Sequence, residues 1–167
     1  MFSILKDDFR TNNVKFTLLS FVKSYLSNYA FKAVVLYRVS HFLHNKGYSI
    51  FATLLRNRCI KVTGCEISPK AKIGSGLKLS HSVGIVISGE AIIGENNIIG
   101  QNVTIGGNYG RHPVIGSNCY IGVGAIIIGG ITIDNNVRVG ANAVVIKDIP
   151  SNSTAVGVPA KNIEHIT

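Results

Sequence analysis

The sequence is poor in cysteine, in charge and in long apolar runs. Its three cysteines form neither a CxxC pair nor a Cys/His set with zinc spacing, so neither a disulfide framework nor a zinc site is indicated. Charged residues make up only 15% and occur without blocks or polar low-complexity tracts, which excludes extended disorder. No stretch reaches the roughly 18 to 20 uncharged apolar residues that a membrane-spanning helix requires. The 167 residues therefore suit one compact folded domain.

The N-terminal segment MFSILKDDFR carries two aspartates and lacks the clean apolar run and small-residue cleavage site of a secretion signal. Because the cysteines are few and odd in number, the simplest expectation is buried, reduced thiols in the cytosol. We expect a cytoplasmic protein, either free or associated with the cytoplasmic face of a membrane.

Acidic residues are scarce, and the shortage is concentrated in the N-terminal third. Residues 1–65 hold ten Lys/Arg against two Asp, whereas residues 66–167 hold seven Lys/Arg against six Asp/Glu. Such a positive segment suits nucleic acid, an anionic membrane surface or a phosphate-bearing substrate. We expect no nucleic-acid partner, because no Arg-rich run, zinc finger or RNA-binding signature accompanies the charge. Peripheral contact with the inner membrane and contact with an anionic substrate both stay open.

Helical periodicity covers the same N-terminal third. Apolar residues return at spacings of three and four from Phe16 to Tyr29 and again from Val35 to Leu43, which predicts helix over residues 13–46. A second short helix is predicted over residues 49–58. We assign residues 1–64 to a basic N-terminal helical segment, whose helices can rest on a membrane but should not cross it.

After Cys65 the apolar pattern changes to a period of six. The step is six throughout, except that two residues are added between Ile85 and Ile93 and four between Ile105 and Ile115. Glycine follows many of the periodic residues, as in Ile121-Gly122. The periodic residues are Ile67, Ile73, Leu79, Ile85, Ile93, Ile99, Ile105, Ile115, Ile121, Ile127, Ile133, Val139 and Val145.

This period is the hexapeptide repeat of a parallel β-helix, in which three hexads form one triangular coil and the periodic residues stack inside. The alternative, a β-sandwich, requires strands spaced by about 8 to 12 residues. We expect the glycines to relieve costly backbone torsions at the corners. The predicted fold is mainly β, with a β-helix over residues 65–150 and a C-terminal coil or tail over residues 151–167.

His81 lies two residues after the periodic Leu79, in LKLSHSVGI, and should therefore lie on the wall of the β-helix and outside its core. Glu66 precedes it by fifteen residues, close to one coil of about eighteen, so a carboxylate should lie near the imidazole. Such a carboxylate can hold the tautomer and support the imidazolium formed on proton transfer. His81 is our candidate general base, and a structural histidine is the alternative.

The four-residue insertion carries the segment GGNYGRHPVIG. Its glycines predict a flexible excursion pinned by Pro113, in which Arg111 and His112 are candidate substrate contacts; a solvated turn is the alternative. Zinc catalysis needs about three ligands, and residues 65–150 offer only His81 and His112 as histidines. We therefore expect no metal.

Taken together, these segments resemble a known family. The repeat, HSVGIVI, TIGGNYGRHPVIG, the closing AVGVPAK and the lead-in VLYRVSHFLHNKG resemble the serine acetyltransferase branch of the hexapeptide-repeat acyltransferases over about residues 30–165. The resemblance implies a left-handed parallel β-helix, homotrimers with active sites between adjacent subunits, and acetyl-CoA as the acetyl donor.

By the same resemblance, His81 is the general base that activates an acceptor hydroxyl, and Glu66 stands where the family has the aspartate that orients it. Arg111 and His112 match the family's substrate-contacting Arg-His pair. The implied coenzyme A path includes Gly106, Gly107, Val123, Gly124, Ala141, Lys147 and Lys161.

Ser80 departs from the family pattern, because serine acetyltransferases have there an aspartate that helps to bind the amino acid. Losing that carboxylate removes a charge-assisted hydrogen bond of about 1.5–3 kcal/mol. The sequence therefore places a sugar hydroxyl of a surface polysaccharide or its precursor first among acceptors. Free serine, in cysteine biosynthesis, is the alternative acceptor, and a non-catalytic β-helix scaffold is the alternative to an enzyme.

Overall fold

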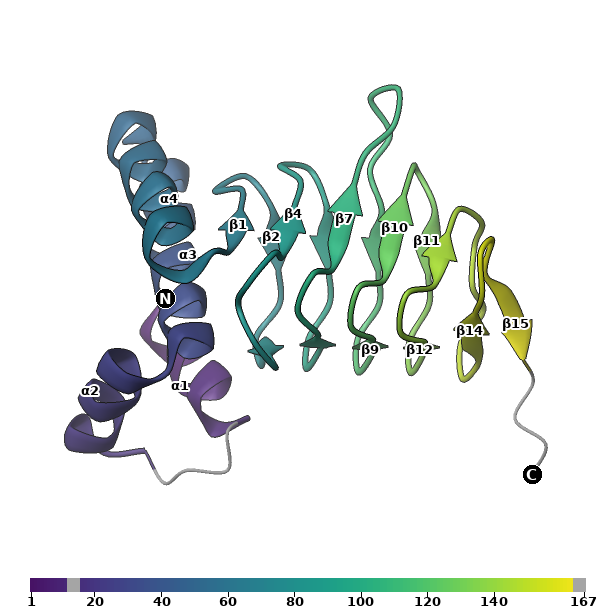
Figure 1. Ribbon diagram of the computed structural model, residues 1–167. Coiled ribbons are helices and arrows are strands. Elements are labelled where there is room, and N and C mark those ends of the chain that lie inside the picture. The colour runs from purple at the N-terminus through teal and green to yellow at the C-terminus, as the bar shows by residue number, and fades with distance from the viewer. Residues whose placement is uncertain (12–15, 164–167) are drawn as a thin grey trace.

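The helices gather at one end of a regular β-solenoid (Figure 1). The computed structural model describes residues 1–11 and 16–163. Its helices are α1 (Phe2–Arg10), α2 (Leu18–Ser27), α3 (Tyr29–Asn45) and α4 (Ser49–Thr63). Within these described ranges, no helix is long and apolar enough to cross a membrane.

The helical segment differs from the prediction of one helix over residues 13–46. Asn28 separates α2 from α3, because its backbone is extended and its side chain accepts a hydrogen bond from the Phe31 N–H (3.0 Å), which caps a new helix. The sequence did not predict α1, and α4 runs past the expected end at Arg58 to a left-handed Gly64. The predicted start at Asn13 lies outside the described residues.

The strands after Gly64 wind into three sheets, one for each wall of the solenoid. Sheet A contains β1, β4, β7, β10 and β13; sheet B contains β2, β5, β8 and β11; sheet C contains β3, β6, β9, β12 and β14, with β15 added antiparallel. The bounds are β1 Glu66–Ile67, β2 Lys72–Ile73, β3 Lys78–Leu79, β4 Val86–Ile87, β5 Ile92–Ile93, β6 Ile98–Ile99, β7 Thr104–Gly106, β8 Val114–Ile115, β9 Tyr120–Ile121, β10 Ile126–Ile128, β11 Thr132–Ile133, β12 Arg138–Val139, β13 Val144–Val145, β14 Thr154–Val156 and β15 Lys161–Ile163.

Columns of buried aliphatic side chains fill the solenoid and confirm the parallel β-helix. All the periodic residues predicted to point inward are buried. In sheet B, for example, Ile73, Ile93, Ile115 and Ile133 pair in register from strand to strand. Each coil therefore buries its apolar residues against the coils on either side, as the hexapeptide pattern predicted.

The strand register corrects the position of the two-residue insertion. Ile67 pairs with Ile87 and not with Ile85, so the added residues lie between Leu79 and Ile87 and not between Ile85 and Ile93. Ile85 is nevertheless buried, two positions before the strand residue. The insertion therefore lies in the turn that carries His81.

The glycines that follow the periodic residues also differ from the expectation. Gly122 and its equivalents do not have positive φ angles; asparagines such as Asn96 and Asn118 occupy most of the left-handed corners instead. A Cβ atom on Gly122 would come within 2.7 Å of backbone atoms of Gly140 and Ala141. These glycines are therefore needed because neighbouring coils approach closely, and the asparagines accept the left-handed torsions.

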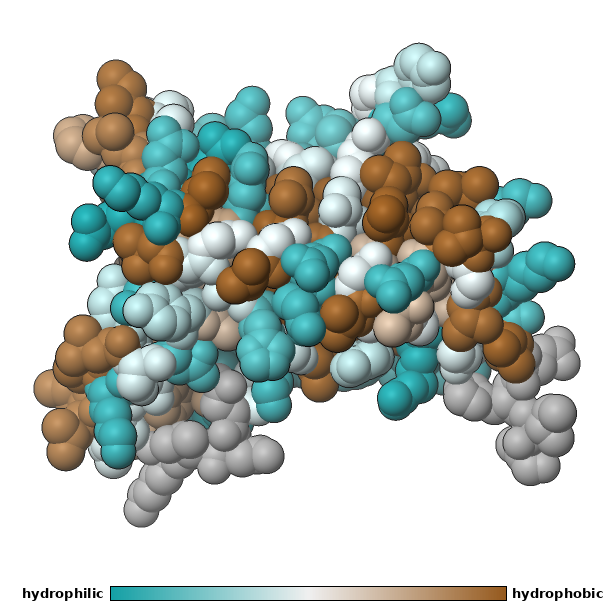
Figure 2. Space-filling model, in the orientation of Figure 1, coloured by the Kyte–Doolittle hydropathy of each residue, from teal (hydrophilic) through white to brown (hydrophobic). Residues whose placement is uncertain are grey.

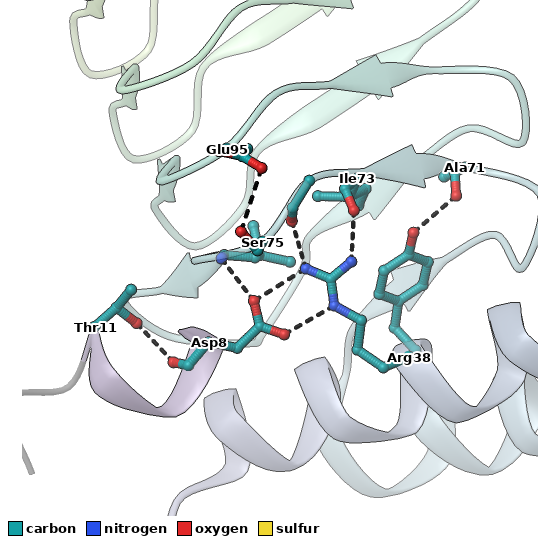
Figure 3. A network of polar contacts seen from close by, with 10 residues as sticks. Asp8, Thr11, Arg38, Ala71, Ile73, Ser75 and Glu95 are labelled. Atoms are coloured by element: carbon teal, nitrogen blue, oxygen red, sulfur yellow. Dashed lines mark hydrogen bonds and ion pairs between the residues drawn. The ribbon is translucent and has the colours of Figure 1, made fainter. Parts of the chain in front are cut away.

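A buried ion pair joins the helices to the first coil (Figure 3). Arg38 Nε of α3 donates to Asp8 Oδ2 of α1 (2.8 Å), and the two side chains are only 4% and 0% exposed. The guanidinium also donates to the carbonyls of Ile73 and Gly74, and Asp8 Oδ1 accepts from the Leu77 N–H (2.9 Å). The pair thereby satisfies backbone groups at the open end of the solenoid.

The solenoid continues beyond residue 150, where the sequence analysis placed the end of the repeat domain. Strand β14 pairs with β12 in parallel and extends sheet C. Strand β15 then folds back along β14 in the antiparallel direction. At the other end, the last helix stops at Thr63 and the first strand begins at Glu66.

Candidate active site

His81 lies in a turn at the edge between sheets C and A. The turn is held at both ends, because the Ser80 N–H donates to the Ile99 carbonyl (2.9 Å) and the Gly84 N–H donates to the Gly64 carbonyl (2.9 Å). The added residues lie within this turn, in which His81 is exposed and Ser82 is buried. Among the described residues, His81 has no hydrogen-bond or ion-pair partner, so the imidazole is available to a ligand.

A pocket of about 430 Å³ adjoins the imidazole. One wall is the turn itself, from Ser80 to Val83, and the other is the junction of α2 and α3 from Ser27 to Ala30. Serine, asparagine and tyrosine supply the polar groups of this lining. No carboxylate belongs to the described lining of the pocket.

Glu66 lies elsewhere, in a groove of about 750 Å³ between α4 and sheet A. Its carboxylate forms an ion pair with Arg56 of α4. No described hydrogen bond joins Glu66 to His81 within one chain, so the orienting role of Glu66 stays a prediction. The sequence reasoning missed Arg56, because only the packing of α4 against β1 brings the guanidinium to this carboxylate.

Arg111 and His112 belong to an ordered β-hairpin, which stands out from the solenoid after β7 (Figure 1). Asn108 and Arg111 exchange two backbone hydrogen bonds (2.8 and 3.0 Å), and Tyr109 and Gly110 both have positive φ, which is the geometry of a two-residue hairpin turn. The segment is therefore a two-residue hairpin that projects from the solenoid, where the sequence predicted an excursion.

His112 folds back from the hairpin onto the second coil. Its Nδ1 lies 3.3 Å from Ser88 Oγ, and its Nε2 lies 3.4 Å from Glu90 Oε2. Ser88 also lines the groove that contains Glu66. The structure therefore brings His112 and Glu66 to the same side of the molecule, whereas Arg111 extends over Gly130.

The predicted residues fall on two opposite edges of sheet A. His81 precedes β4 at the edge shared with sheet C, and the hairpin with Arg111 and His112 follows β7 at the edge shared with sheet B. Within one chain the parts of the candidate site are thus separated by a wall of the solenoid.

The candidate coenzyme A residues divide between the same two edges of sheet A. We call the edge shared with sheet C the C/A edge and the edge shared with sheet B the A/B edge. Val123, Gly124 and Ala141 stack on the C/A edge beyond His81, where the Asn142 N–H donates to the Val123 carbonyl (2.8 Å). Their small side chains are partly or fully exposed, which suits a narrow ligand arm lying along the backbone. On the A/B edge are Gly106 at the end of β7, Gly107 after it, and the exposed Lys147 after β13; Lys161 begins β15.

Gln101 is a further residue of the C/A edge that the sequence reasoning missed. The Gly124 N–H donates to its backbone carbonyl (2.9 Å), which places Gln101 in the same stack as Val123. Its side-chain Oε1 is buried and has no partner among the described residues. A signal existed, because Gln101, Val123 and Ala141 each follow the inward residue of sheet C by two positions. In the first coil the equivalent residue is Val83 and not His81, since the Asn102 N–H donates to the Val83 carbonyl (3.0 Å).

Metal ligands and reactive thiols do not gather at either edge. In residues 1–11 and 16–163, no three His, Cys, Asp or Glu side chains lie close enough to share a metal ion. Cys59, Cys65 and Cys119 are free and buried, and burial raises the pKa of the Cys65 thiol.

Comparisons with known proteins show which family the chain resembles. The model of the family "Bacterial transferase hexapeptide (six repeats)" matches residues 112–147. A serine acetyltransferase of Helicobacter pylori is 42% identical over 135 residues, which cover 78% of this chain and 79% of that protein. The chain spans less of several longer relatives, such as 54% of a serine acetyltransferase of Buchnera aphidicola that is 46% identical over 143 residues.

Solved structures show the same likeness. Neisseria gonorrhoeae serine acetyltransferase in complex with serine superposes with a TM-score of 0.80 at 41% identity, covering 83% of this chain and 58% of that chain. Serine acetyltransferase from Brucella abortus in complex with coenzyme A superposes with a TM-score of 0.87 at 34% identity, covering 97% of this chain and 67% of that chain.

Proposed function

Because this chain belongs to the hexapeptide-repeat acyltransferases, in the branch of the serine acetyltransferases, we propose that it transfers the acetyl group of acetyl-CoA to an acceptor hydroxyl. The observation that carries the proposal is the exposed imidazole of His81 beside a pocket. His81 lies at the start of the C/A edge, along which small residues leave room for acetyl-CoA.

His81 acts as the general base in this proposal. An alcohol is a poor nucleophile at neutral pH, so the neutral imidazole accepts the hydroxyl proton while the oxygen bonds to the thioester carbon. The carbon–sulfur bond then breaks, and the imidazolium returns the proton to the departing sulfur. Backbone N–H groups of a neighbouring coil can stabilise the negative charge that develops on the carbonyl oxygen.

Serine is the acceptor that the relatives favour. The named relatives are serine acetyltransferases, and one of the solved structures contains serine. This finding supports the acceptor that the sequence analysis placed second more than the polysaccharide sugar that it placed first. We therefore propose an O-acetyltransferase for which serine is the first acceptor to test.

A sugar hydroxyl remains the second candidate because of one observation. Ser80 stands beside His81, and the described lining of the pocket contains no carboxylate. An amino acid would therefore leave its ammonium group without a charged partner on this wall. A neutral polyol would not require one.

The substitution Ser80→Asp tests the choice of acceptor. If serine binds in this pocket, the new carboxylate should raise kcat/KM for serine by about ten- to a hundredfold, since a charge-assisted hydrogen bond contributes about 1.5–3 kcal/mol. Release of thiol from acetyl-CoA is the measurement, with serine and simple sugars as acceptors. Ser151→Asp is the matched control, because it places a carboxylate on an exposed serine that does not line the pocket. Turnover with a sugar and none with serine, in both the native chain and Ser80→Asp, would overturn the serine proposal.

We also propose that the site is completed between subunits of a homotrimer. Two observations support this: the predicted residues lie on opposite edges of sheet A, and the outer face of this sheet exposes Val86 and Ile126. Contact between neighbouring chains along sheet A would bring the hairpin of one chain to the His81 pocket of the next.

Mixing two inactive variants tests this arrangement. We expect His81→Ala and His112→Ala each to be nearly inactive alone, and mixed trimers to regain about a quarter of native activity, because a quarter of random neighbouring pairs combine two native halves. Activity after joint refolding is the measurement, and co-purification of the untagged variant with an affinity-tagged partner variant is the control for mixing. No recovery in assemblies shown to be mixed would place the whole site within one chain.

A further inference from the structure

Helix α2 carries an apolar stripe that the protein covers only in part. Phe21 and Tyr25 pack into a cluster with Phe9 and Phe31. The rest of the stripe points outward: Leu19 is 80% exposed and Leu26 65%, and Leu18 and Val22 are exposed as well. We call Leu18, Leu19, Val22 and Leu26 the α2 patch. Val22 follows Leu18 by four positions and Leu19 by three, and Leu26 follows Val22 by four, so these residues share one face of the helix.

A second apolar patch lies at the same end of the molecule. Ile50, Phe51 and Leu54 of α4 are exposed. Figure 2 shows hydrophobic side chains gathered over α2 and over α4, both at the helical end of the solenoid. Isolated exposed leucines are common on soluble proteins, whereas contiguous exposed patches mark interaction surfaces.

The charged residues of the segment that contains the α2 patch are of one sign. No aspartate or glutamate occurs between Asp8 and Glu66, and Lys23 follows Val22 directly. Lys32 places its Nζ 4.7 Å from the ring centre of Tyr29 and 5.6 Å from that of Tyr25. Exposed leucines bordered by lysine and tyrosine are the composition of helices that lie in a membrane interface.

We propose that the helical end of this protein docks on an anionic lipid surface through the α2 patch. The leucines enter the boundary between headgroups and acyl chains, and the surrounding lysines attract the negative headgroups. The absence of acidic residues from position 9 to position 65 suits this partner, because nothing in that segment would repel an anionic surface.

A second copy of the chain suits the patch less well. If two copies met through their α2 patches, two positive surfaces would face each other, and residues 9–65 contain no carboxylate to pair across the contact. Like charges placed opposite each other oppose association. The charge pattern therefore favours lipid over a symmetric contact between two α2 patches.

Docking through α2 would also bring the candidate pocket close to the lipid surface. Ser27 at the end of α2, together with Asn28 and Tyr29, forms one wall of the pocket beside His81. The docking itself does not depend on catalysis, so membrane binding can be tested independently of the acyltransferase proposal.

Sedimentation with lipid vesicles tests the proposal. The full chain should bind vesicles of phosphatidylcholine that contain about 30% phosphatidylglycerol, and binding should fall as salt is raised, because headgroup attraction is screened. We expect Leu19→Glu/Leu26→Glu to weaken binding by about tenfold or more, since the variant puts negative charge where apolar side chains would enter the lipid. Ile163→Glu on β15 is the matched control, an exposed aliphatic residue at the far end of the solenoid, and it should bind like the native chain.

Lys23→Gln separates the electrostatic contribution to vesicle binding from the apolar contribution. It should weaken binding to anionic vesicles and leave binding to pure phosphatidylcholine unchanged. Three results would overturn the proposal: no binding of the native chain, equal binding to vesicles of pure phosphatidylcholine, or equal loss in Ile163→Glu. A smaller assembly in Leu19→Glu/Leu26→Glu, with no vesicle binding by the native chain, would show that a second copy covers the patch. Circular dichroism confirms that each variant is folded.

Discussion

Replacing His81 with alanine is expected to lower kcat by about 10²–10⁴-fold, the usual contribution of a general base. The imidazole is exposed beside the pocket and has no partner among the described residues. Its loss should therefore remove proton transfer without disturbing the turn, and the free energy of unfolding should change by no more than about 0.5 kcal/mol. The KM for acetyl-CoA should stay near the native value, because the ring takes part in the reaction and not in holding the donor.

Thiol release from acetyl-CoA at saturating donor and acceptor measures this effect. His81→Gln is the companion variant, because glutamine keeps a polar side chain but cannot act as a base near neutral pH; it should be as slow as His81→Ala. A kcat within a few-fold of the native value in both variants would remove His81 from the mechanism. A loss of unfolding free energy well above about 0.5 kcal/mol in both variants would show that His81 has a structural role.

Replacing Asp8 with asparagine is expected to lower the free energy of unfolding by about 3–5 kcal/mol, the usual cost of removing one partner from a buried ion pair. Asp8 and Arg38 are almost fully buried, and the carboxylate is held between the guanidinium and the Leu77 N–H. Asparagine fills nearly the same space but leaves the charge of Arg38 buried without its counter-ion.

Chemical denaturation followed by circular dichroism measures this loss. Asp7→Asn is the matched control, because the neighbouring Asp7 makes only an exposed pair with Arg10 at 3.4 Å; surface pairs contribute about 0–1 kcal/mol. Replacing both partners with apolar residues, Asp8→Leu/Arg38→Met, removes the unpaired charge but takes these partners from the Ile73 and Gly74 carbonyls and the Leu77 N–H, so the double variant should also be less stable than the native chain. Equal effects of Asp7→Asn and Asp8→Asn would show that the buried pair does not hold the helices to the solenoid.

Much of the fold could be predicted from the period of six, but its register could not. Both Ile85 and Ile87 are buried, so the step from Leu79 can be counted as six followed by eight or as eight followed by six. Because both residues are isoleucine, the hydrophobic pattern is the same under either count and cannot choose between them. Only the backbone pairing of Ile67 with Ile87 decides that the insertion lies in the turn of His81.

The helical segment was predicted in outline only. The apolar spacing from Phe16 to Tyr29 continues past Asn28 and so concealed the break at this residue, whose side chain caps α3. The spacing also made no distinction between apolar residues that pack and those that stay exposed. Phe21 is packed, while Leu19 on the same helix is exposed, because α2 has a neighbour on one side only.

The sequence by itself determined the stack of coils, because the stack follows from local periodicity: every sixth residue points inward. His81 is exposed as predicted, but it lies in the inserted turn, where the period of six is interrupted. Only the tertiary structure decided which side chains meet across the fold. It paired Glu66 with Arg56 and Asp8 with Arg38, and it placed His81 and His112 on opposite edges of sheet A. These contacts depend on how helices and coils pack in space, and no spacing along the chain records that packing.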